Sequence, residues 1–385
     1  MSFGKMPIAN AFLKKENFKD EFFFEMEVGF SEELSLFQLN DHPKPSMMFN
    51  ENYPFFTGSS EYMKVHFRDY ANWIKKKIVN MQTNIIEIGS NDGTFLENFK
   101  EKEISVLGFE PSKNVADKAK EQGINTTNQF FNSKTIKDHN KFLNNTDIIC
   151  AANAICHVPN LKDLIEAVDS MLNKNGLFIF EEPYLGSMFS KISYDQIYDE
   201  HIFMFSATSV SKIFNLFDME LIDLLPQTTH GGSMRYVIGR KNIHVINKNV
   251  IDKLNEEKNL NLDNISSCLK FKKECENSKD KLNFKIDKIL ADKKSICGYA
   301  ATSKSTTILN FCGIDKNKID YICDTTPEKI NKFSPGTHIP IVSMDHFKNN
   351  MPDYAFLFAW NHKKEIFAKE DEFSKKGKWI AHIDL

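Results

Sequence analysis

Cysteines are few in this chain, and none of them lies close to another. The sequence holds seven, from Cys150 to Cys323, and no two form a C-x-x-C pair. A thiolate zinc site and a disulfide framework both need cysteines at short, regular spacings. Neither is indicated here.

An excess of charge of one sign is also missing. There are 49 Lys and Arg against 52 Asp and Glu, a formal net charge of −3. Without a basic stripe we expect no nucleic-acid partner. No apolar run approaches membrane-spanning length, and Met1 to Lys5 begin no apolar signal segment. We therefore expect a cytoplasmic protein with no membrane partner, and the 385 residues predict two or three domains.

The stretch from residue 85 to residue 96 is the most informative part of the sequence. Ile85 to Ile88 is a short β-branched run typical of a buried parallel strand. A turn of Gly, Ser, Asn and Asp follows, and then Phe95, Leu96 and Phe99 at helical spacing. A strand, a glycine turn and a helix let a ligand approach the backbone closely. The next strand, 105–109, leads to Glu110, where nucleoside-binding units place a carboxylate that holds ribose hydroxyls.

The turn favours one cofactor over another. A dinucleotide site needs G-x-G-x-x-G, whereas the pattern here is Glu87-x-Gly89-x-Asn91-x-Gly93. The acids Glu87 and Asp92 would repel a pyrophosphate and would suit a cation with an amino-acid tail. The pattern resembles motif I of the class I S-adenosylmethionine methyltransferases. The alternative is an ordinary strand, loop and helix with no ligand. The glycines, both acids and Glu110 together favour a cofactor site instead.

The periodicity of apolar residues divides the chain into parts. Residues 1–72 predict strands over 22–28 and 34–39, and a helix follows from Glu61 to about Val79. Residues 241–290 predict a helical connector. The two regions that alternate strands and helices have strands expected at 85–88, 105–109, 147–152, 177–181, 218–225 and 234–239, and then at 295–299, 319–323 and 354–359. The first is a doubly wound sheet with a closing hairpin, and the second is another α/β unit.

Two segments offer groups for proton transfer. Tyr198-Asp199-Glu200-His201 places a phenol, two carboxylates and an imidazole in one turn beside a run of aromatics. Burial and neighbouring charges move pKa values toward neutrality, which a general base needs. The alternative is a surface loop with a capping acid. His157 follows the strand at 147–152, at the sheet edge where α/β proteins bind ligands, although a lone His is more often structural.

Two further turns are suited to anions. In His230-Gly231-Gly232-Ser233-Met234-Arg235 the glycines expose N–H groups and Arg235 offers a bidentate guanidinium, unless the segment is only a turn between strands. Gly298 to Ser305 nearly spells a phosphate-binding P-loop, with Asp324 in the place of a Walker B acid. Ser303 replaces its second glycine, which argues against an ATPase. A diphosphate held by N–H groups and Lys304 stays open.

These segments occur together, and in this order, in one family. The chain resembles the S-adenosylmethionine-dependent sugar C-methyltransferases, which act on nucleotide-linked keto-deoxysugars. Motif I is shared by many methyltransferases, whereas the Glu-His segment, the H-G-G-S turn and the P-G-T-H-I-P-I segment are more specific. The matching segments are 7–13, 87–94, 108–116, 197–201, 230–233, 335–341 and 359–361.

The resemblance implies a fold class: an α/β protein with a class I methyltransferase Rossmann-like domain, a second C-terminal α/β Rossmann-like domain and a small N-terminal domain. The expected boundaries are 1–72 for an N-terminal domain resembling a zinc domain that lost its cysteines, 73–240 for the methyltransferase domain, 241–290 for the connector and 291–385 for the sugar-nucleotide domain. Ser31 and Leu34 stand where one C-x-x-C pair would lie, and residue 1 falls after the other, so we expect no zinc.

Other departures from the family concern the substrate. The family often reads Y-H-E-H where this chain has Tyr198-Asp199-Glu200-His201, and Ala300 and Ser305 stand where glycines are common. The sugar, the nucleotide base and the methylated carbon therefore stay open. So does the oligomeric state, for which we expect a monomer or a weak homo-oligomer.

The resemblance also implies roles for residues. A base removes the proton beside a ketone, and the enolate carbon then attacks the sulfonium methyl without a metal. The base is expected to be His201 or Glu200, with His157 and Tyr198 at the enolate oxygen and Tyr53 nearby. The expected cofactor contacts are Glu87, Gly89, Asn91, Gly93, Glu110, Pro111 and Asn153. The expected sugar-nucleotide contacts are His230, Gly231, Gly232, Ser233, Arg235, Tyr299, Lys304, Asp324, Trp360 and Asn361.

Three rival functions can be compared with this one. A nucleotide-sugar O-methyltransferase shares the cofactor site but needs no acidic C–H bond. An NAD-dependent oxidoreductase needs the glycine pattern that is missing here. A non-catalytic sugar-nucleotide-binding protein would keep both α/β domains and tolerate the loss of Glu200 and His201.

Overall fold

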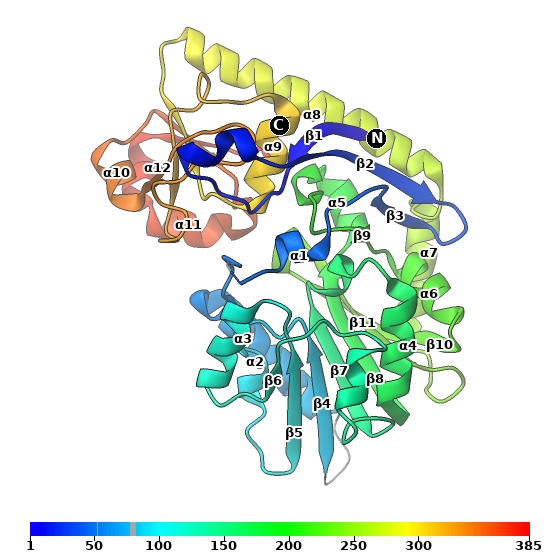
Figure 1. The fold of residues 1–385 in the computed structure, drawn as a ribbon. Helices are drawn as coiled ribbons and strands as arrows, with labels where there is room; N and C mark the ends of the chain where they lie inside the picture. Colours follow the sequence, from blue (N-terminus) through cyan, green and yellow to red (C-terminus); the bar gives the residue numbers. More distant parts are fainter. Residues whose placement is uncertain (52, 78–81) are drawn as a thin grey trace.

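The structure is a computed structural model that describes residues 1–51, 53–77 and 82–385. In this part of the chain the strands form three sheets. Figure 1 shows the largest of them in cyan and green, the C-terminal unit in orange and red, and the long helix α8 (Ile265–Ala291) in yellow. None of the helices in the described ranges is long and apolar enough to cross a membrane.

The largest sheet has the strand order β10-β11-β8-β7-β4-β5-β6. Its strands from β8 to β6 are parallel, whereas β11 runs antiparallel to both of its neighbours. This confirms the predicted doubly wound sheet with a closing hairpin. The strands are β4 (Thr83–Ile88), β5 (Ile104–Phe109), β6 (Thr126–Thr127), β7 (Thr146–Ala152), β8 (Leu172–Pro183), β10 (Met219–Gln227) and β11 (Ser233–Arg240).

Alternating side chains of these strands build two cores, one on each face of the sheet. Ile86 and Ile88 lie in a cluster with the helix α4 (Leu161–Met171). Ile85 belongs to the other cluster, with the helix α2 (Glu61–Lys75). Because both faces are covered, the central residues of these strands form apolar runs, and these runs made the strands predictable from the sequence. The remaining helices of this region are α1 (Pro45–Met48), α3 (Lys113–Glu121), α5 (Leu185–Lys191) and α6 (Ala207–Asn215).

Two helix predictions differ from the structure. The helix expected after the glycine turn is only a 3₁₀ turn, η3 (Leu96–Asn98). The Asn98 amide donates to the carbonyls of Thr94 and Phe95, in competition with the hydrogen bonds that would continue an α-helix. The helix predicted to reach Val79 ends at Lys75, and Ile78 and Val79 lie outside the described residues.

The C-terminal unit is a parallel sheet of order β14-β13-β12-β15-β16. Its strands are β12 (Ile296–Tyr299), β13 (Ile322–Asp324), β14 (Ile341–Ser343), β15 (Tyr354–Leu357) and β16 (Lys378–Ile380). Its helices are α9 (Ser303–Cys312), α10 (Met344–Asn349), α11 (Lys363–Lys369) and α12 (Asp371–Lys376). Helices α7 (Lys248–Asn259) and α8 lead into it from the first sheet. The second predicted α/β unit is therefore confirmed as a Rossmann-like layer.

The third sheet joins the beginning of the chain to its middle. It has the order β1-β2-β3-β9, with β1 (Ser2–Pro7), β2 (Phe23–Ser31), β3 (Leu36–Leu39) and β9 (Phe203–Met204). Its side chains share one core with helices α8 and α9, in which Phe3 and Met26 lie with Leu282 and Ile308. The N-terminal strands are therefore held by apolar packing, and β9 brings the turn at residues 198–201 beside them.

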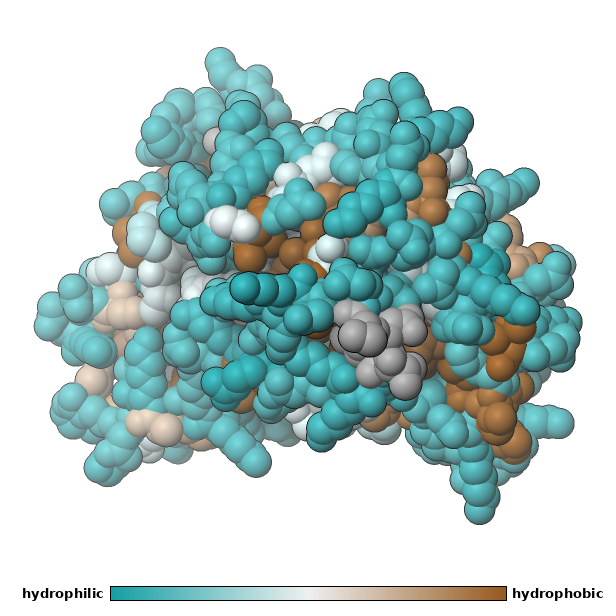
Figure 2. All heavy atoms as spheres, turned by 90° about the horizontal axis from the view of Figure 1, so that it is seen from below, coloured by the Kyte–Doolittle hydropathy of each residue, from teal (hydrophilic) through white to brown (hydrophobic). Residues whose placement is uncertain are grey.

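The surface follows from this inward packing. Figure 2 shows the face seen from below, where hydrophilic residues cover most of the area and apolar residues appear between them. Most large apolar side chains are instead turned toward the clusters between the layers.

Candidate active site

A cavity of about 1270 Å³ collects residues from the seven-stranded sheet, from the C-terminal sheet and from the N-terminal segment. Its walls come from the N-terminal segment, from the loops after β4, β5 and β7, from the turn at residues 198–200 and from the start of α9. The loops follow the carboxyl ends of parallel strands, where the sequence led us to expect a ligand.

The glycine turn after β4 forms one wall. Gly89 has φ 71°, and a Cβ atom there would lie 2.7 Å from the Cβ of Ala154. Only glycine can therefore hold this backbone against the loop after β7. The N–H groups of Gly89 and Ser90 bind the carbonyl of Phe109, and the N–H of Asn91 donates to Glu110 Oε2 at 3.0 Å. The turn is thus fixed to the neighbouring strand, and Gly89 and Asn91 line the cavity.

Three buried acids surround this turn. Glu110 accepts hydrogen bonds from the N–H groups of Asn91 and Ser112, and burial raises its pKa to about 7. Glu87 lies behind the turn, and burial, with smaller effects from Asp92 and Glu110, raises its pKa well above the usual range. A cation would relieve the cost of these crowded carboxyl groups.

A phenol and an imidazole form a hydrogen-bonded pair in the turn before β9. The Tyr198 hydroxyl lies 2.7 Å from His201 Nε2, and His201 Nδ1 lies 2.8 Å from the carbonyl of Gln196. A carbonyl only accepts, so Nδ1 carries the proton and Nε2 accepts from Tyr198. Burial, more than any neighbour, lowers the pKa of His201 well below its usual value. Tyr198 lines the cavity and His201 does not, so His201 acts on the cavity through Tyr198.

Glu200 is the acid of this turn that faces the cavity. Its Oε1 accepts from the Asn10 amide at 2.7 Å, and its carboxyl group is also hydrogen-bonded to Tyr53. Burial raises the pKa of Glu200 to about 7, although the bonds from Asn10 and Tyr53 oppose the rise. The adjacent Asp199 points elsewhere and accepts from the backbone N–H of Ala9 at 2.8 Å. Glu200 is therefore placed to exchange a proton with a ligand near neutral pH.

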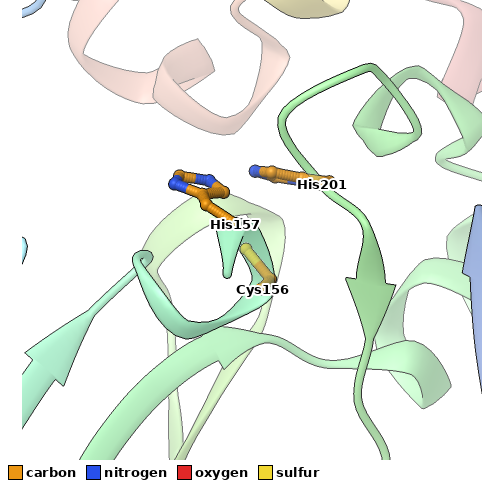
Figure 3. Close-up of side chains that lie close together, drawn as sticks. All are labelled: Cys156, His157 and His201. Atoms are coloured by element: carbon orange, nitrogen blue, oxygen red, sulfur yellow. The ribbon is translucent and has the colours of Figure 1, made fainter. Parts of the chain in front are cut away.

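His157 lies next to His201. Figure 3 shows the two rings next to each other, and their centroids are 5.4 Å apart with planes at 22°. Burial lowers the pKa of His157 to about 3, so the ring is neutral. Its Nε2 has no hydrogen-bond partner among the described residues. A neutral imidazole with an uncommitted ring nitrogen can serve a reacting oxygen.

Cys156, His157 and His201 bring a sulfur and ring nitrogens within 4.8 Å of one another (Figure 3). His201 Nε2 is occupied by Tyr198, and burial raises the pKa of the Cys156 thiol. Metal ligands must be deprotonated and free of other hydrogen bonds, so this arrangement fits a neutral proton-transfer group better than a metal centre.

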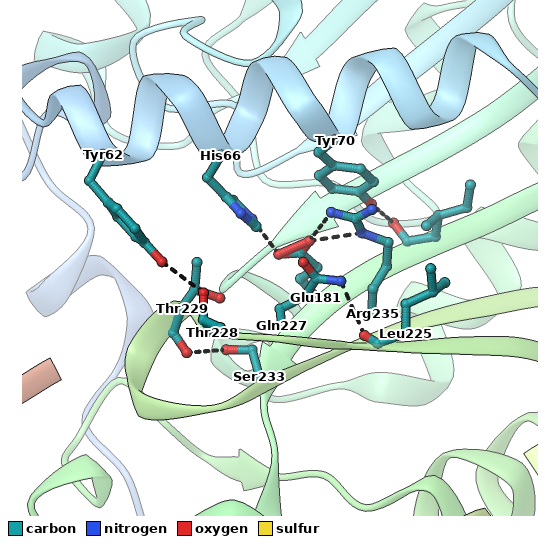
Figure 4. A network of polar contacts seen from close by, with 11 residues as sticks. Tyr62, His66, Tyr70, Glu181, Leu225, Gln227, Thr228, Thr229, Ser233 and Arg235 are labelled. Carbon is teal, nitrogen blue, oxygen red and sulfur yellow. Dashed lines mark hydrogen bonds and ion pairs between the residues drawn. The ribbon is translucent and has the colours of Figure 1, made fainter. Parts of the chain in front are cut away.

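Arg235 corrects a prediction. Its Nε and Nη2 both donate to Glu181 Oε2, at 2.8 and 2.6 Å, and its guanidinium lies 3.6 Å from the Tyr70 ring centroid. Figure 4 shows this pair beneath α2, with His66 on the other oxygen of Glu181. The side chain is buried and outside the cavity, so it ties α2 to the sheet and is not free to bind an anion.

The glycines next to it also have a packing role. A Cβ atom on Gly231 would lie 2.1 Å from the Trp360 ring, so glycine lets the two units approach. Trp360 donates its ring N–H to Asp195 at 2.7 Å, and the hydroxyl of Tyr299 donates to Glu370 at 2.9 Å. These polar atoms already have hydrogen-bond partners. Gly231, Trp360 and Tyr299, which were expected to bind the substrate, therefore support the cavity wall instead.

The C-terminal wall carries the buried cation Lys304. Its Nζ lies 3.4 Å from Asn361 Oδ1 and 4.8 Å from the Trp360 ring centroid. Burial lowers its pKa, although Asp195 opposes this. Asp324 accepts from the N–H groups of Ala301 and Thr326, both at 2.7 Å, which fixes the turn before α9. Lys304, Asp324 and Asn361 all line the cavity.

Comparisons with known proteins decide the family. Residues 49–224 match the model of a methyltransferase domain, and residues 228–383 match that of a C-methyltransferase C-terminal domain. The C-methyltransferase NovU of Streptomyces niveus is 27% identical over 380 residues, covering 98% of this chain and 90% of NovU. This chain is similar to the S-adenosylmethionine-dependent C-methyltransferases over nearly its whole length. The predicted family, enzyme class and cofactor are thereby confirmed.

Solved structures resemble a part of this C-methyltransferase. The YcgJ protein from Bacillus subtilis is 13% identical, with a TM-score of 0.37, and covers 46% of this chain and 100% of its own. The plantazolicin methyltransferase BpumL, bound to SAH, is 14% identical, with a TM-score of 0.36, and covers 46% and 82%.

The residues around the glycine turn fit S-adenosylmethionine. Glu87 Oε2 and Asn153 Oδ1 are buried acceptors without a hydrogen-bond partner in the described structure. Asn153 and Pro111 line the cavity beside Glu110. Unpaired acceptors among carboxyl groups suit a ligand that is cationic and donates hydrogen bonds.

The cavity gathers most of the predicted site residues, but not all of them. Those that line it are Tyr53, Gly89, Asn91, Glu110, Pro111, Asn153, His157, Tyr198, Glu200, His230, Ser233, Lys304, Asp324 and Asn361. Those that lie outside its lining are Glu87, Gly93, His201, Gly231, Gly232, Arg235, Tyr299 and Trp360.

Asn10, His66 and Lys329 are among the lining residues that were not predicted. Asn10 lies in the segment 7–13, which carries the family resemblance. That resemblance could therefore have marked Asn10 as a candidate site residue. His66 and Lys329 belong to no motif. Lys329 donates to the carbonyl of Ala301 at 2.7 Å, a contact that the fold alone creates.

Proposed function

We propose that this C-methyltransferase transfers a methyl group to the carbon beside a ketone in a nucleotide-linked deoxysugar, and that Glu200 removes the proton. One observation carries the proposal. Glu200, Tyr198 and Tyr53 share one cavity with the glycine turn, and the pKa of Glu200 is about 7. A base of this pKa suits the weakly acidic C–H bond of a ketone near neutral pH.

The cofactor contacts proposed are Gly89, Asn91, Glu110, Pro111 and Asn153, with Glu87 and Gly93 shaping the turn from behind. Glu110 would hold the ribose hydroxyls, because its two oxygens already anchor the turn and face the cavity. When bound, S-adenosylmethionine supplies an electrophilic methyl group. The surrounding acids favour its positive charge.

The remaining groups would handle the ketone oxygen. Tyr198 and His157 both line the cavity, and each is uncharged. His201 accepts the Tyr198 proton in a hydrogen bond and so fixes the direction of the phenol oxygen. We assign Glu200, rather than His201, as the base because only Glu200 of the two lines the cavity. Hydrogen bonds to the developing enolate oxygen stabilise the transition state more than the ketone.

The C-terminal wall would bind the nucleotide. Lys304 is buried there and Lys329 is half-buried, and burial lowers the pKa values of both. A diphosphate would restore a favourable environment for both cations. In this arrangement residues 1–72 and 73–240 serve the sugar and the cofactor, 291–385 serve the nucleotide, and 241–290 connect them.

Proton exchange in heavy water tests the proposal. With the demethylated cofactor bound, a keto-sugar nucleotide should exchange the hydrogen beside its ketone, because deprotonation precedes methyl transfer. Glu200→Gln should slow exchange by about 10²–10⁴-fold, the usual contribution of a general base. His201→Asn should slow it less, because His201 acts through Tyr198.

The outcomes separate the possible functions. A wild-type enzyme that methylates oxygen and exchanges nothing would be a nucleotide-sugar O-methyltransferase. Full exchange in Glu200→Gln would remove Glu200 from the role of base. Binding of a sugar nucleotide without turnover would indicate a non-catalytic binding protein.

A further inference from the structure

The segment from Ile8 to Leu13 passes between the two α/β units and is tied to both. The N–H of Ala9 donates to Asp199 Oδ1 at 2.8 Å, in the turn before β9. The carbonyl of the same residue accepts from Thr306 Oγ1 of α9 at 2.9 Å. One residue near the N-terminus thus contacts positions 190 and 297 residues away.

Further contacts hold the next residues of this segment. Leu13 exchanges two backbone hydrogen bonds with Phe333, of 3.2 and 2.8 Å. Phe12 is buried, and Lys329 Nζ lies 5.0 Å from its ring centroid. The segment is therefore anchored on both sides of residue 10, and its position is fixed by the fold.

The Asn10 side chain, between these anchors, is the one that enters the cavity. It lines the cavity wall, and its Nδ2 donates to Glu200 Oε1 at 2.7 Å. An amide has no titratable proton, so it donates to the carboxylate without competing for the proton that Glu200 would take. A hydrogen bond at this distance also fixes the direction of the other carboxylate oxygen.

We propose that Asn10 is a positioning residue for Glu200, and that the N-terminal segment completes the active site of this C-methyltransferase. The inference rests on the proposed function, because it assumes that Glu200 takes the proton. It assigns a specific role to Asn10, which has none in that function.

The electrostatic surroundings show why a neutral donor matters. The titratable groups that face Glu200 are Tyr53 of the N-terminal segment, Cys156 after β7, and Tyr198 and Asp199 of its own turn. None is a cation, and the pKa of each is raised. The ionised form of Glu200 is therefore held by hydrogen bonds, of which that from Asn10 has the largest effect. Without it the pKa of Glu200 would rise further.

The test is the pH dependence of turnover in Asn10→Ala. A hydrogen bond to a charged group contributes about 1.5–3 kcal/mol, which corresponds to about one to two pH units. We expect the acidic limb of the kcat profile to move to higher pH by that amount, with unchanged S-adenosylmethionine affinity in calorimetry. Asn10→Ser should shift the limb less, because a hydroxyl can still donate.

Thr306→Val is the matched control. It removes an anchor of the same segment and leaves the amide of Asn10 in place, so the limb should stay where it is in the wild type. If Asn10→Ala fails to fold, Asn10→Ser decides the question through the same profile. An unmoved limb, or an equal loss of kcat at every pH, in whichever variant folds would overturn the inference. Failure of the proposed function looks different, since the wild type itself would then show no C-methylation.

Discussion

At the scale of single residues, the acids of the glycine turn differ in what they can do for a ligand. Glu87 is behind the backbone, Asp92 is bonded to the Thr94 hydroxyl and the Gly58 N–H, and Glu110 faces the cavity. Of the three acids, Glu110 is therefore the one whose loss should weaken nucleoside binding most.

We expect Glu110→Ala to weaken S-adenosylmethionine binding by roughly 1–3 kcal/mol, the usual loss of a hydrogen bond to a charged group. Isothermal calorimetry measures this. Glu121→Ala, an exposed acid at the end of α3, is the control and should bind as the wild type does. If the wild type bound NADH more tightly than S-adenosylmethionine, the cofactor site would be assigned wrongly.

Ala300 is a residue whose backbone the fold constrains. Its φ is 72°, a conformation in which a Cβ atom costs about 1–2 kcal/mol, and its N–H bonds the carbonyl of Cys323 at 2.9 Å. Ala300→Gly should raise the free energy of unfolding by about 0.5–1 kcal/mol, after allowing for the greater freedom of unfolded glycine. Chemical denaturation measures it, and a less stable variant would contradict this explanation.

At the scale of elements, the loop after β7 is organised by one carboxyl group of β8. Glu182 Oε1 accepts from the N–H groups of Ala154, Ile155 and Cys156, at 3.0, 2.7 and 3.2 Å. These residues directly precede His157, so Glu182 fixes the position of the His157 ring relative to the sheet. Burial raises the pKa of Glu182 to about 7, although these hydrogen bonds oppose the rise.

The sign of the resulting pH dependence follows from linkage. An acid whose pKa is higher in the folded state than in the unfolded chain binds more protons when folded, so stability falls as pH rises through that window. For Glu182 the window runs from its ordinary value, near 4.5, to about 7. Glu182→Gln should therefore gain about 3 kcal/mol relative to wild type between pH 4.5 and 7. Denaturation at several pH values measures this, and a constant difference would contradict it.

Some of these elements could be predicted from the sequence, and others could not. Strands β4, β5, β7 and β8 were predictable because both faces of each are apolar. Strand β1 was not, because Ser2–Pro7 contains Gly4 and Lys5 and acquires its pattern only by pairing with β2. The pairing of Arg235 with Glu181, 54 residues apart, leaves no local signal either. Motifs identified which residues matter, while the choice between binding and packing roles depended on tertiary contacts.

At the scale of the whole molecule, the N-terminal strands share one hydrophobic core with the C-terminal unit. They pack with α8 and α9 of the C-terminal half and present Asn10 to the cavity. Apolar packing thus holds these strands in place, and residues 1–149 contain no cysteine.

Elemental analysis of protein purified without a metal-binding tag should therefore find substoichiometric zinc. A chelator-resistant zinc in a 1:1 ratio would contradict this explanation. Loss of that zinc in His157→Asn would then point to the group of Cys156, His157 and His201.

The most direct test of the whole account is the position of the transferred methyl group. Keto-sugar nucleotides are incubated with the enzyme and S-adenosylmethionine carrying a ¹³C-labelled methyl group, and the product is analysed by mass spectrometry and NMR. The account predicts a product with the labelled methyl on the carbon beside the ketone, and a much slower reaction in Glu200→Gln. A labelled methyl on oxygen, or wild-type rates in Glu200→Gln, would contradict it.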